Sequence, residues 1–231
     1  MPSNVYWQPL LDALLPAMCL LCRQVGVGTS LCAACVADLP RLPAACPVCA
    51  SAIADAAALC GRCQRRLPPY TQLIAPLDYA FPVDGLLRRL KFHRELALAE
   101  PLAGVMAAAV LDADIECDVV VPVPLHWRRL IWRGFNQAQC LAEPLAAAID
   151  RPMRARALVR TRATRAQSAL PRSARRRNVV GVFSADARVV NGRHCLLVDD
   201  VVTSGATITV ATEALLAAGA RSVTVACVAR A

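Results

Sequence analysis

Residues 194–207 read H-C-L-L-V-D-D-V-V-T-S-G-A-T, and this stretch decides the fold. Its first part, Cys195 to Val198, is a short apolar run that predicts a buried strand. Asp199 and Asp200 follow where we expect that strand to end. A turn rich in hydroxyl groups then leads into an alanine-rich helix, expected from about residue 206 to 218. The stretch therefore predicts a strand, a turn and a helix of an α/β sheet.

The turn after this strand offers groups that hold an anion. Ligands of open α/β sheets bind at the carboxyl ends of the strands, and the start of a helix presents free backbone N–H groups. Asp199 and Asp200 can accept hydrogen bonds from hydroxyls, directly or through Mg²⁺. The combination suits a phosphorylated sugar diol. The structural alternative, an ordinary turn pair of acids, does not account for the hydroxyl-rich turn.

Strands alternate with helices along the rest of the chain. Strands are expected at residues 73–79, 118–122, 158–159, 179–183 and 222–228, and helices at 4–16, 82–92, 96–111 and from the R-G-F-N-Q segment (133–137) to about 149. This alternation predicts a doubly wound parallel sheet with right-handed crossovers. Lys91 is the chain's lone lysine, and the favourable interaction of a cation with a helix C-terminus accounts for it.

Eight of the twelve cysteines form four C-x-x-C pairs before residue 64. In a chain without an export signal, this spacing points to metal rather than to disulfides. We assign one zinc ion to Cys19, Cys22, Cys32 and Cys35 and a second to Cys46, Cys49, Cys60 and Cys63; an interleaved pairing stays open. The segment is poor in large apolar residues, so zinc would supply folding energy. We expect both ions to be structural.

Two domains are expected, a zinc-ribbon module at residues 1–68 and an α/β domain at 69–231, joined by a linker with Pro68-Pro69. Apolar runs fall short of the roughly 18–20 residues that a membrane span needs. The region from Leu10 to Leu21 lacks the features of a signal peptide. These observations predict a cytoplasmic protein without a membrane span.

Positive charge is concentrated in arginine. The net charge is +9, and all basic residues except Lys91 are arginines. The window from Arg151 to Arg177 is rich in arginine and contains neither Asp nor Glu. The planar guanidinium suits phosphate, although a solvated basic loop is the alternative.

Several motifs together resemble the ComF family, in which a type I phosphoribosyltransferase domain follows a double zinc ribbon. They are the cysteine pairs, P-V-P-L at 122–125, R-G-F-N-Q at 133–137, R-T-R-A-T-R-A-Q at 160–167, Arg177-Asn178 and L-V-D-D-V-V-T-S-G-A-T at 197–207. The resemblance implies a site for phosphoribosyl pyrophosphate and Mg²⁺. The segment from Leu125 to Trp132 is a longer insertion than is usual in this fold.

The resemblance also assigns roles to residues. Asp199, Asp200 and Arg162 would be catalytic. The residues that would bind the ligand are Asp199, Asp200, Val201, Val202, Thr203, Ser204, Gly205, Ala206, Thr207, Arg133, Gly134, Thr164 and Gln167. Arg162, Thr164 and Gln167 fall in the segment that matches a loop closing over pyrophosphate.

ComF-like proteins are associated with natural competence, which implies a role in handling internalised single-stranded DNA. Two hypotheses follow: an enzyme that transfers a phosphoribosyl group to an unknown acceptor, or a non-catalytic sensor or accessory module that binds DNA or competence proteins. Aromatic residues make up 4% of the chain, few for the stacking platforms that bind single strands. Release of pyrophosphate would separate the two hypotheses.

Overall fold

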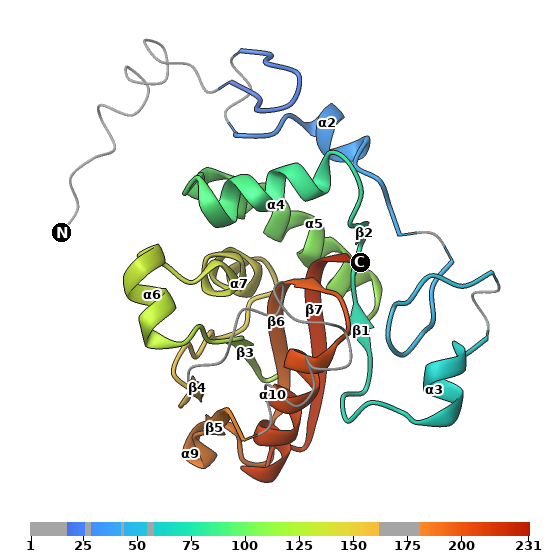
Figure 1. Ribbon diagram of the computed structural model, residues 1–231, viewed down its shortest axis with the longest axis vertical. Helices are drawn as coiled ribbons and strands as arrows, with labels where there is room; N and C mark the ends of the chain where they lie inside the picture. Colours follow the sequence, from blue (N-terminus) through green and yellow to red (C-terminus); the bar gives the residue numbers. More distant parts are fainter. Residues whose placement is uncertain (1–17, 26–28, 43, 55–57, 162–180) are drawn as a thin grey trace.

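The computed structural model of the chain describes residues 18–25, 29–42, 44–54, 58–161 and 181–231 (Figure 1). The helix expected at residues 4–16 lies outside these ranges, as do Arg162, Thr164 and Gln167. The elements in chain order are α2 (Ala33–Ala37), α3 (Gly61–Arg65), β1 (Leu73–Ile74), β2 (Leu77–Asp78), α4 (Val83–Phe92), the 3-10 helix η1 (Leu96–Leu98), α5 (Ala99–Asp112), β3 (Val119–Pro122), α6 (Trp127–Arg133), α7 (Gln137–Ala148), β4 (Leu158–Arg160), β5 (Phe183–Ala185), α9 (Ala187–Val190), β6 (His194–Val202), α10 (Ala206–Ala217) and β7 (Ser222–Arg230).

A parallel sheet forms the centre of the molecule. Its order is β1-β7-β6-β3, and β2 pairs with β7 beyond the end of β1. The longest pairing joins β6 to β7, from His194 opposite Ser222 to Val202 opposite Arg230. Nearly every residue of β7 is buried, as expected of a strand covered on both faces. The predicted parallel α/β sheet is confirmed.

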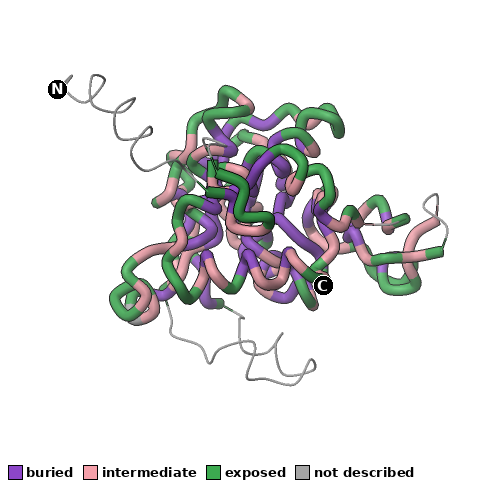
Figure 2. Tube along the Cα trace, turned by 90° about the horizontal axis from the view of Figure 1, so that it is seen from above, coloured by how far each residue is buried: buried purple, intermediate pink, exposed green. Residues whose placement is uncertain are grey.

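Helices cover both faces of this sheet (Figure 1). Leu196 and Val198 of β6 pack in one core with α4, α5 and α7. Cys195 and Leu197 point to the opposite face and pack in a second core with α10 and the β4–β5 pair, because successive side chains of a strand alternate between faces. Figure 2 shows the buried residues at the centre and the exposed residues around it.

Strand β6 is longer than predicted. It was expected to end at Val198, but it continues through Asp199 and Asp200 to Val202. Its neighbour β7 extends equally far and keeps pairing with it. The segment expected as one strand at 73–79 is instead divided into β1 and β2 around Pro76, which has no N–H for the ladder.

One other expectation about the sheet is wrong. Strands β4 and β5 form a separate antiparallel pair, with Leu158 opposite Ala185, and take no part in the parallel sheet. The segment from Leu125 to Trp132, expected as a long insertion, contains helix α6. No helix of the described residues is long and apolar enough to cross a membrane.

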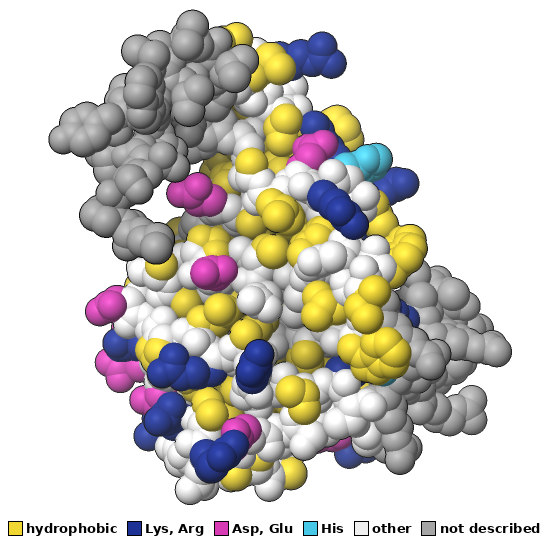
Figure 3. All heavy atoms as spheres, turned by 90° about the vertical axis from the view of Figure 1, so that its left-hand side faces the viewer, with side chains coloured by type: hydrophobic (Ala, Val, Ile, Leu, Met, Phe, Trp, Pro, Cys, Tyr) yellow, Lys and Arg dark blue, Asp and Glu magenta, His cyan; other side chains and the backbone are white. Residues whose placement is uncertain are grey.

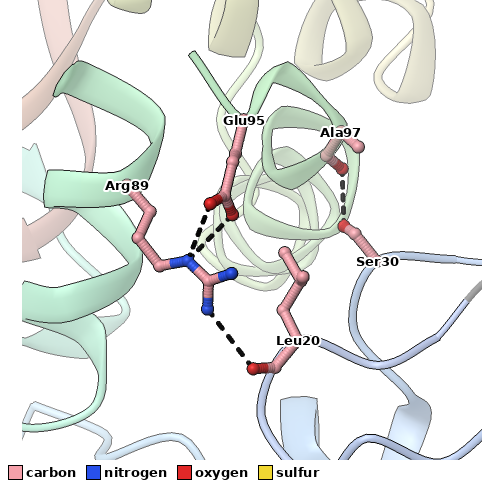
Figure 4. Close-up of polar contacts among 5 residues, drawn as sticks. All are labelled: Leu20, Ser30, Arg89, Glu95 and Ala97. Carbon is pink, nitrogen blue, oxygen red and sulfur yellow. Dashed lines mark hydrogen bonds and ion pairs between the residues drawn. The ribbon is translucent and has the colours of Figure 1, made fainter. Parts of the chain in front are cut away.

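The first cysteine-rich segment packs against α4 and the turn after it (Figure 4). Arg89 forms an ion pair with Glu95, its Nε lying 2.8 Å from Oε2, and Nη1 donates to the Leu20 carbonyl at 3.4 Å. Ser30 Oγ donates to the Ala97 carbonyl at 2.6 Å. These contacts fix this segment to one face of the α/β domain.

Both cysteine-rich segments also reach the outer edge of the sheet. The N–H of Asp78 donates to the Pro40 carbonyl at 3.0 Å, and the N–H of Leu73 donates to the Val48 carbonyl at 2.9 Å. Arg41 and Leu77 form an antiparallel bridge. The backbone of β1 and β2 is therefore paired on both sides.

We expect Gly219→Ala to lower the free energy of unfolding by about 1–2 kcal/mol or more, because a left-handed backbone costs that much with a Cβ. Gly219 follows the end of α10 with a φ of +93°, and an added Cβ would lie 2.3 Å from Asn191 Oδ1. The matched control is Gly104→Ala in α5, which has open space around the new Cβ and should stabilise by about 0.5–1 kcal/mol. Urea denaturation of both variants measures the change in the free energy of unfolding. Equal changes in Gly219→Ala and Gly104→Ala would contradict the prediction.

Candidate functional site

Two groups of four cysteines are assembled in the cysteine-rich segments. In each group, the four sulfur atoms lie within 4.8 Å of one another. The groups are Cys19, Cys22, Cys32 and Cys35, and Cys46, Cys49, Cys60 and Cys63. The expected sequential pairing is confirmed, and the interleaved pairing is excluded. Four sulfur ligands at this range fit a tetrahedral structural zinc ion.

The electrostatics of these groups favour a bound cation. Burial raises the pKa of the Cys49 thiol, but hydrogen bonds from Ser51 and neighbouring cysteines outweigh it and lower the pKa to about 6. In the other group, hydrogen bonding with Cys32, together with burial and the nearby Cys19, raises the pKa of Cys35 to about 12. One thiolate of the second group thus forms readily, whereas Cys35 of the first group keeps its proton unless a positive charge such as zinc compensates its thiolate.

A cavity of about 700 Å³ opens beyond the carboxyl ends of β3 and β6. Its walls come from the end of β2, α4, the β3–α7 connection, β4 and the start of α10. It is lined by Tyr79, Leu87, Arg88, Lys91, Phe92, Val123, Pro124, Leu125, Arg129, Trp132, Arg133, Asn136, Gln137, Arg160, Asp199, Asp200, Val201, Thr203 and Thr207. This is the position where parallel α/β sheets bind ligands.

Asp199 and Asp200 lie on the floor of this cavity. Asp200 is 5% exposed, and one of its oxygens lies 2.5 Å from Lys91 Nζ. Asp199 accepts a hydrogen bond from the N–H of Asp200 at 2.9 Å. Burial and the neighbouring charge of Asp200 raise the pKa of Asp199 to about 8, although Lys91 acts in the opposite direction. The ligand-free site thus holds two acids at close range with one compensating ammonium.

The loop that follows β6 lines a small hollow of about 30 Å³ beside the two acids. Gly205 precedes α10 and has a φ of +76°, in the region that glycine adopts without a Cβ penalty. Ser204 Oγ accepts from the N–H of Ala206 at 3.4 Å. The start of helix α10 brings backbone N–H groups and the positive end of the helix dipole to this hollow, which is the chemistry of a phosphate site.

Cations outnumber acids in the cavity lining. Five basic residues, Arg88, Lys91, Arg129, Arg133 and Arg160, face two acids. Arg133 donates to Gln137 Oε1 at 2.7 Å and lies over the Phe92 ring, 5.4 Å from its centroid. Burial lowers the pKa of Arg160 to about 10. The excess of positive charge suits a ligand with several negative charges.

The structure brings most of the described site candidates together. Asp199, Asp200, Val201, Thr203, Thr207 and Arg133 line the main cavity, and Val202, Ser204, Gly205 and Ala206 line the hollow. Gly134 is not in either lining; it has a φ of +84° and follows the last residue of α6.

Other lining residues were not found from the sequence. Lys91 was assigned to helix C-terminal charge, but it pairs with Asp200. Phe92, the last residue of α4, is 58% exposed and lines the cavity. Trp132 and Arg129 come from α6, which was read as an insertion. The sequence offered one clue to the role of Lys91, which is the single lysine of an arginine-rich chain.

Comparisons with known proteins agree with this architecture. Residues 138–231 match the family described as phosphoribosyl transferase domain, and residues 10–64 match the double zinc ribbon domain. The chain is 36% identical over 223 residues to the DNA utilization protein YhgH of Escherichia coli strain K12, covering 93% of this chain and 97% of the relative. It belongs to the ComF/YhgH family.

Further similarities extend beyond this relative. Competence protein F of Haemophilus influenzae is 30% identical over 199 residues, covering 82% of this chain and 86% of that protein. Among solved structures, the glutamine phosphoribosylpyrophosphate amidotransferase from B. subtilis matches 62% of this chain and 30% of its own, with 22% identity and a TM-score of 0.44.

We expect Asp199→Asn to raise the free energy of unfolding most at alkaline pH. The folded protein binds the Asp199 proton more tightly than the unfolded chain does, so this contribution is fully present below pH 3.8 and is lost as the pH rises through about 8. Each pKa unit added by the fold corresponds to about 1.4 kcal/mol. Denaturant unfolding of the wild type and the variant between about pH 5 and 8 measures the difference.

Asp186→Asn is the control, because Arg188 lowers the pKa of this exposed carboxyl and the dependence on pH has the opposite sign. An Asp199→Asn variant whose advantage does not grow with pH would contradict the burial of a charged carboxylate at this position.

Proposed function

We propose that this protein binds phosphoribosyl pyrophosphate with Mg²⁺ in the cavity at the end of β6 and acts in the handling of internalised DNA. The observation that supports this most directly is the placement of Asp199 and Asp200 beside the loop of residues 203–207, below a lining with excess positive charge. In a sugar phosphate, the phosphate group and the diol are only a few bonds apart. The phosphate would match the loop of residues 203–207, and the diol would match the neighbouring Asp199 and Asp200.

Each part of the ligand has suitable partners among the described residues. The 5′-phosphate would accept hydrogen bonds from the N–H groups and hydroxyls of residues 203–207. The ribose hydroxyls would donate to Asp199 and Asp200. The pyrophosphate would lie near Arg133 and Arg129, whose guanidinium groups suit phosphate oxygens. Arg162, Thr164 and Gln167, proposed for the same task, lie outside the described residues.

The acids also fit a magnesium ion. Mg²⁺ prefers carboxylate and phosphate oxygens, and two carboxylates at close range with one ammonium can accommodate further positive charge. Bound at Asp199 and Asp200, Mg²⁺ would supply charge neutralisation for the pyrophosphate.

A transfer reaction would break the bond between the sugar C1 and the pyrophosphate oxygen and form a bond from C1 to the acceptor, which loses a proton. Arg133 and Arg129 would stabilise the negative charge of the departing pyrophosphate. The apolar side of the cavity, formed by Leu87, Phe92 and Trp132, is the place left for an acceptor.

The role with DNA is supported by two relatives, whose names refer to DNA utilization and to competence. A surface next to the cavity suits such a partner. Helix α6 exposes Trp127, Ile131 and Trp132, which are 57%, 74% and 75% exposed, and exposed hydrophobic side chains lie on the face of the molecule that carries this helix (Figure 3). Exposed tryptophans offer flat faces on which bases stack.

We expect Asp200→Asn to weaken the binding of phosphoribosyl pyrophosphate with Mg²⁺ about tenfold to a hundredfold, because charge-assisted hydrogen bonds contribute about 1.5–3 kcal/mol. Isothermal calorimetry measures the affinity, with Asp186→Asn outside the cavity as the matched control. An unchanged affinity in Asp200→Asn, or no binding to the wild type, would refute the proposal. Release of pyrophosphate with candidate acceptors then separates an enzyme from a non-catalytic sensor.

We expect the double variant Trp127→Ala/Trp132→Ala to bind single-stranded DNA about tenfold or more weakly, because stacking contributes about 1–3 kcal/mol per base. Fluorescence anisotropy with a labelled oligonucleotide at two salt concentrations measures the affinity. Leu111→Ala, 60% exposed on α5, is the control. Equal affinities for all three proteins would exclude α6 as the DNA contact.

A further inference from the structure

Arg230, the last residue of β7, joins the second cysteine group to the loop of residues 203–207. Its side chain is buried, at 5% exposure. Nε donates to the Cys49 carbonyl at 3.2 Å, and Nη2 donates to Ser51 Oγ at 3.1 Å. Nη1 donates to the Val202 carbonyl at 2.8 Å and to the Thr203 carbonyl. One buried guanidinium thus bonds to the cysteine-rich segment on one side and to the loop after β6 on the other.

Arg62 makes a second connection of the same kind. It lies on α3, between the zinc-ligating positions Cys60 and Cys63, and its Nη1 donates to the Ser204 carbonyl at 2.8 Å. Its Nη2 would lie 3.9 Å from a Cβ placed on Gly205. Together, Arg230 and Arg62 bond to three successive carbonyls, those of residues 202–204.

These contacts orient the opposite side of the loop. In a trans peptide the C=O and the following N–H point in opposite directions. When Arg230 and Arg62 hold the carbonyls of Thr203 and Ser204, the N–H groups of Ser204 and Gly205 are turned away from the arginines. The hollow at the start of α10 is lined by the same residues. The arginines therefore fix the donors on which phosphate binding depends.

The side-chain contacts of both arginines depend on the second cysteine group. The buried centre of this segment consists of Cys46, Cys49 and Cys63, with Val48, Ile53, Leu59 and Cys60 packed against them. So small an apolar centre cannot fix the chain without a metal ion. The carbonyl that Arg230 contacts belongs to Cys49 itself, and Arg62 lies one residue away from Cys63.

We infer that Arg230 and Arg62 are positioning residues that couple zinc in the second cysteine group to the phosphate affinity of residues 203–207. The inference rests on the proposed function for the identity of the ligand only. Coupling between two sites is reciprocal, so the bound phosphate ligand also retains this zinc ion. The first cysteine group contacts α4 and η1 instead (Figure 4), so its zinc should be insensitive to the ligand.

The first test replaces Arg62, which is exposed and whose loss leaves the cysteines intact. In Arg62→Ala, we expect amide hydrogen exchange of residues 203–207 to accelerate in the ligand-free protein, and the affinity for phosphoribosyl pyrophosphate with Mg²⁺ to fall about tenfold. Arg65→Ala on the same helix is the charge-matched control and should leave both within twofold. Arg62→Lys, which keeps a donor, should restore part of the protection.

The second test measures zinc release to a chromogenic chelator, with and without the ligand. Cys22→Ser removes a ligand of the first group, so the remaining release reports on the second. We expect the ligand to slow this release, and Arg62→Ala to abolish the slowing. In the wild type, the release that remains after subtraction of the Cys22→Ser trace comes from the first group, and it should not respond to the ligand.

The outcomes separate this inference from the proposed function. If the wild type does not bind phosphoribosyl pyrophosphate, the proposed function fails, while hydrogen exchange in Arg62→Ala and after zinc removal still tests the coupling. Unchanged exchange of residues 203–207 in both experiments would overturn the inference even if the ligand binds. If Arg62→Ala and Arg65→Ala changed hydrogen exchange and affinity equally, the effect of Arg62 would come from its charge alone, and its role as a positioning residue would be refuted.

Discussion

The continuous parallel pairing of β6 with β7 is the constraint on which the rest of the structure depends. It begins at His194 opposite Ser222 and ends at Val202 opposite Arg230. Because the ladder extends past the acids, Asp199 and Asp200 lie on rigid strand backbone rather than on a loop. The same ladder places Arg230 beside Val202 and Thr203, where the loop after β6 begins. One pairing thus positions the acids, the loop and the arginine that holds it.

The cavity combines charges that are unfavourable without a ligand. Asp199 is held in a surrounding that raises its pKa, and burial lowers the pKa of Arg133 and Arg160. Charged groups in surroundings that disfavour their charge lower the stability of the ligand-free fold. Perturbed pKa values of this kind are common at functional sites. The two cysteine groups and the apolar cores on both faces of the sheet offset this cost.

The parts that could be predicted from the sequence are those with local causes. The buried strand, the hydroxyl-rich turn and the helix after it follow one another in the chain, as do the cysteine pairs. Lys91 and Asp200 are far apart in sequence, so their ion pair could not be predicted. The position of Lys91 near a helix C-terminus already explained its charge locally. The run Leu158-Val159 is too short to show which sheet it joins. Arg62 and Arg230 gain their roles only when the second cysteine group packs against β7.

The pairing of the cysteine-rich segments with β1 and β2 has a further consequence. A strand at the edge of a sheet exposes N–H and C=O groups that can pair with another chain. Here the carbonyls of Pro40 and Val48 accept from the N–H groups of Asp78 and Leu73 and cover this edge. The cysteine-rich segments therefore occupy backbone groups that an uncovered edge strand would offer to a second chain.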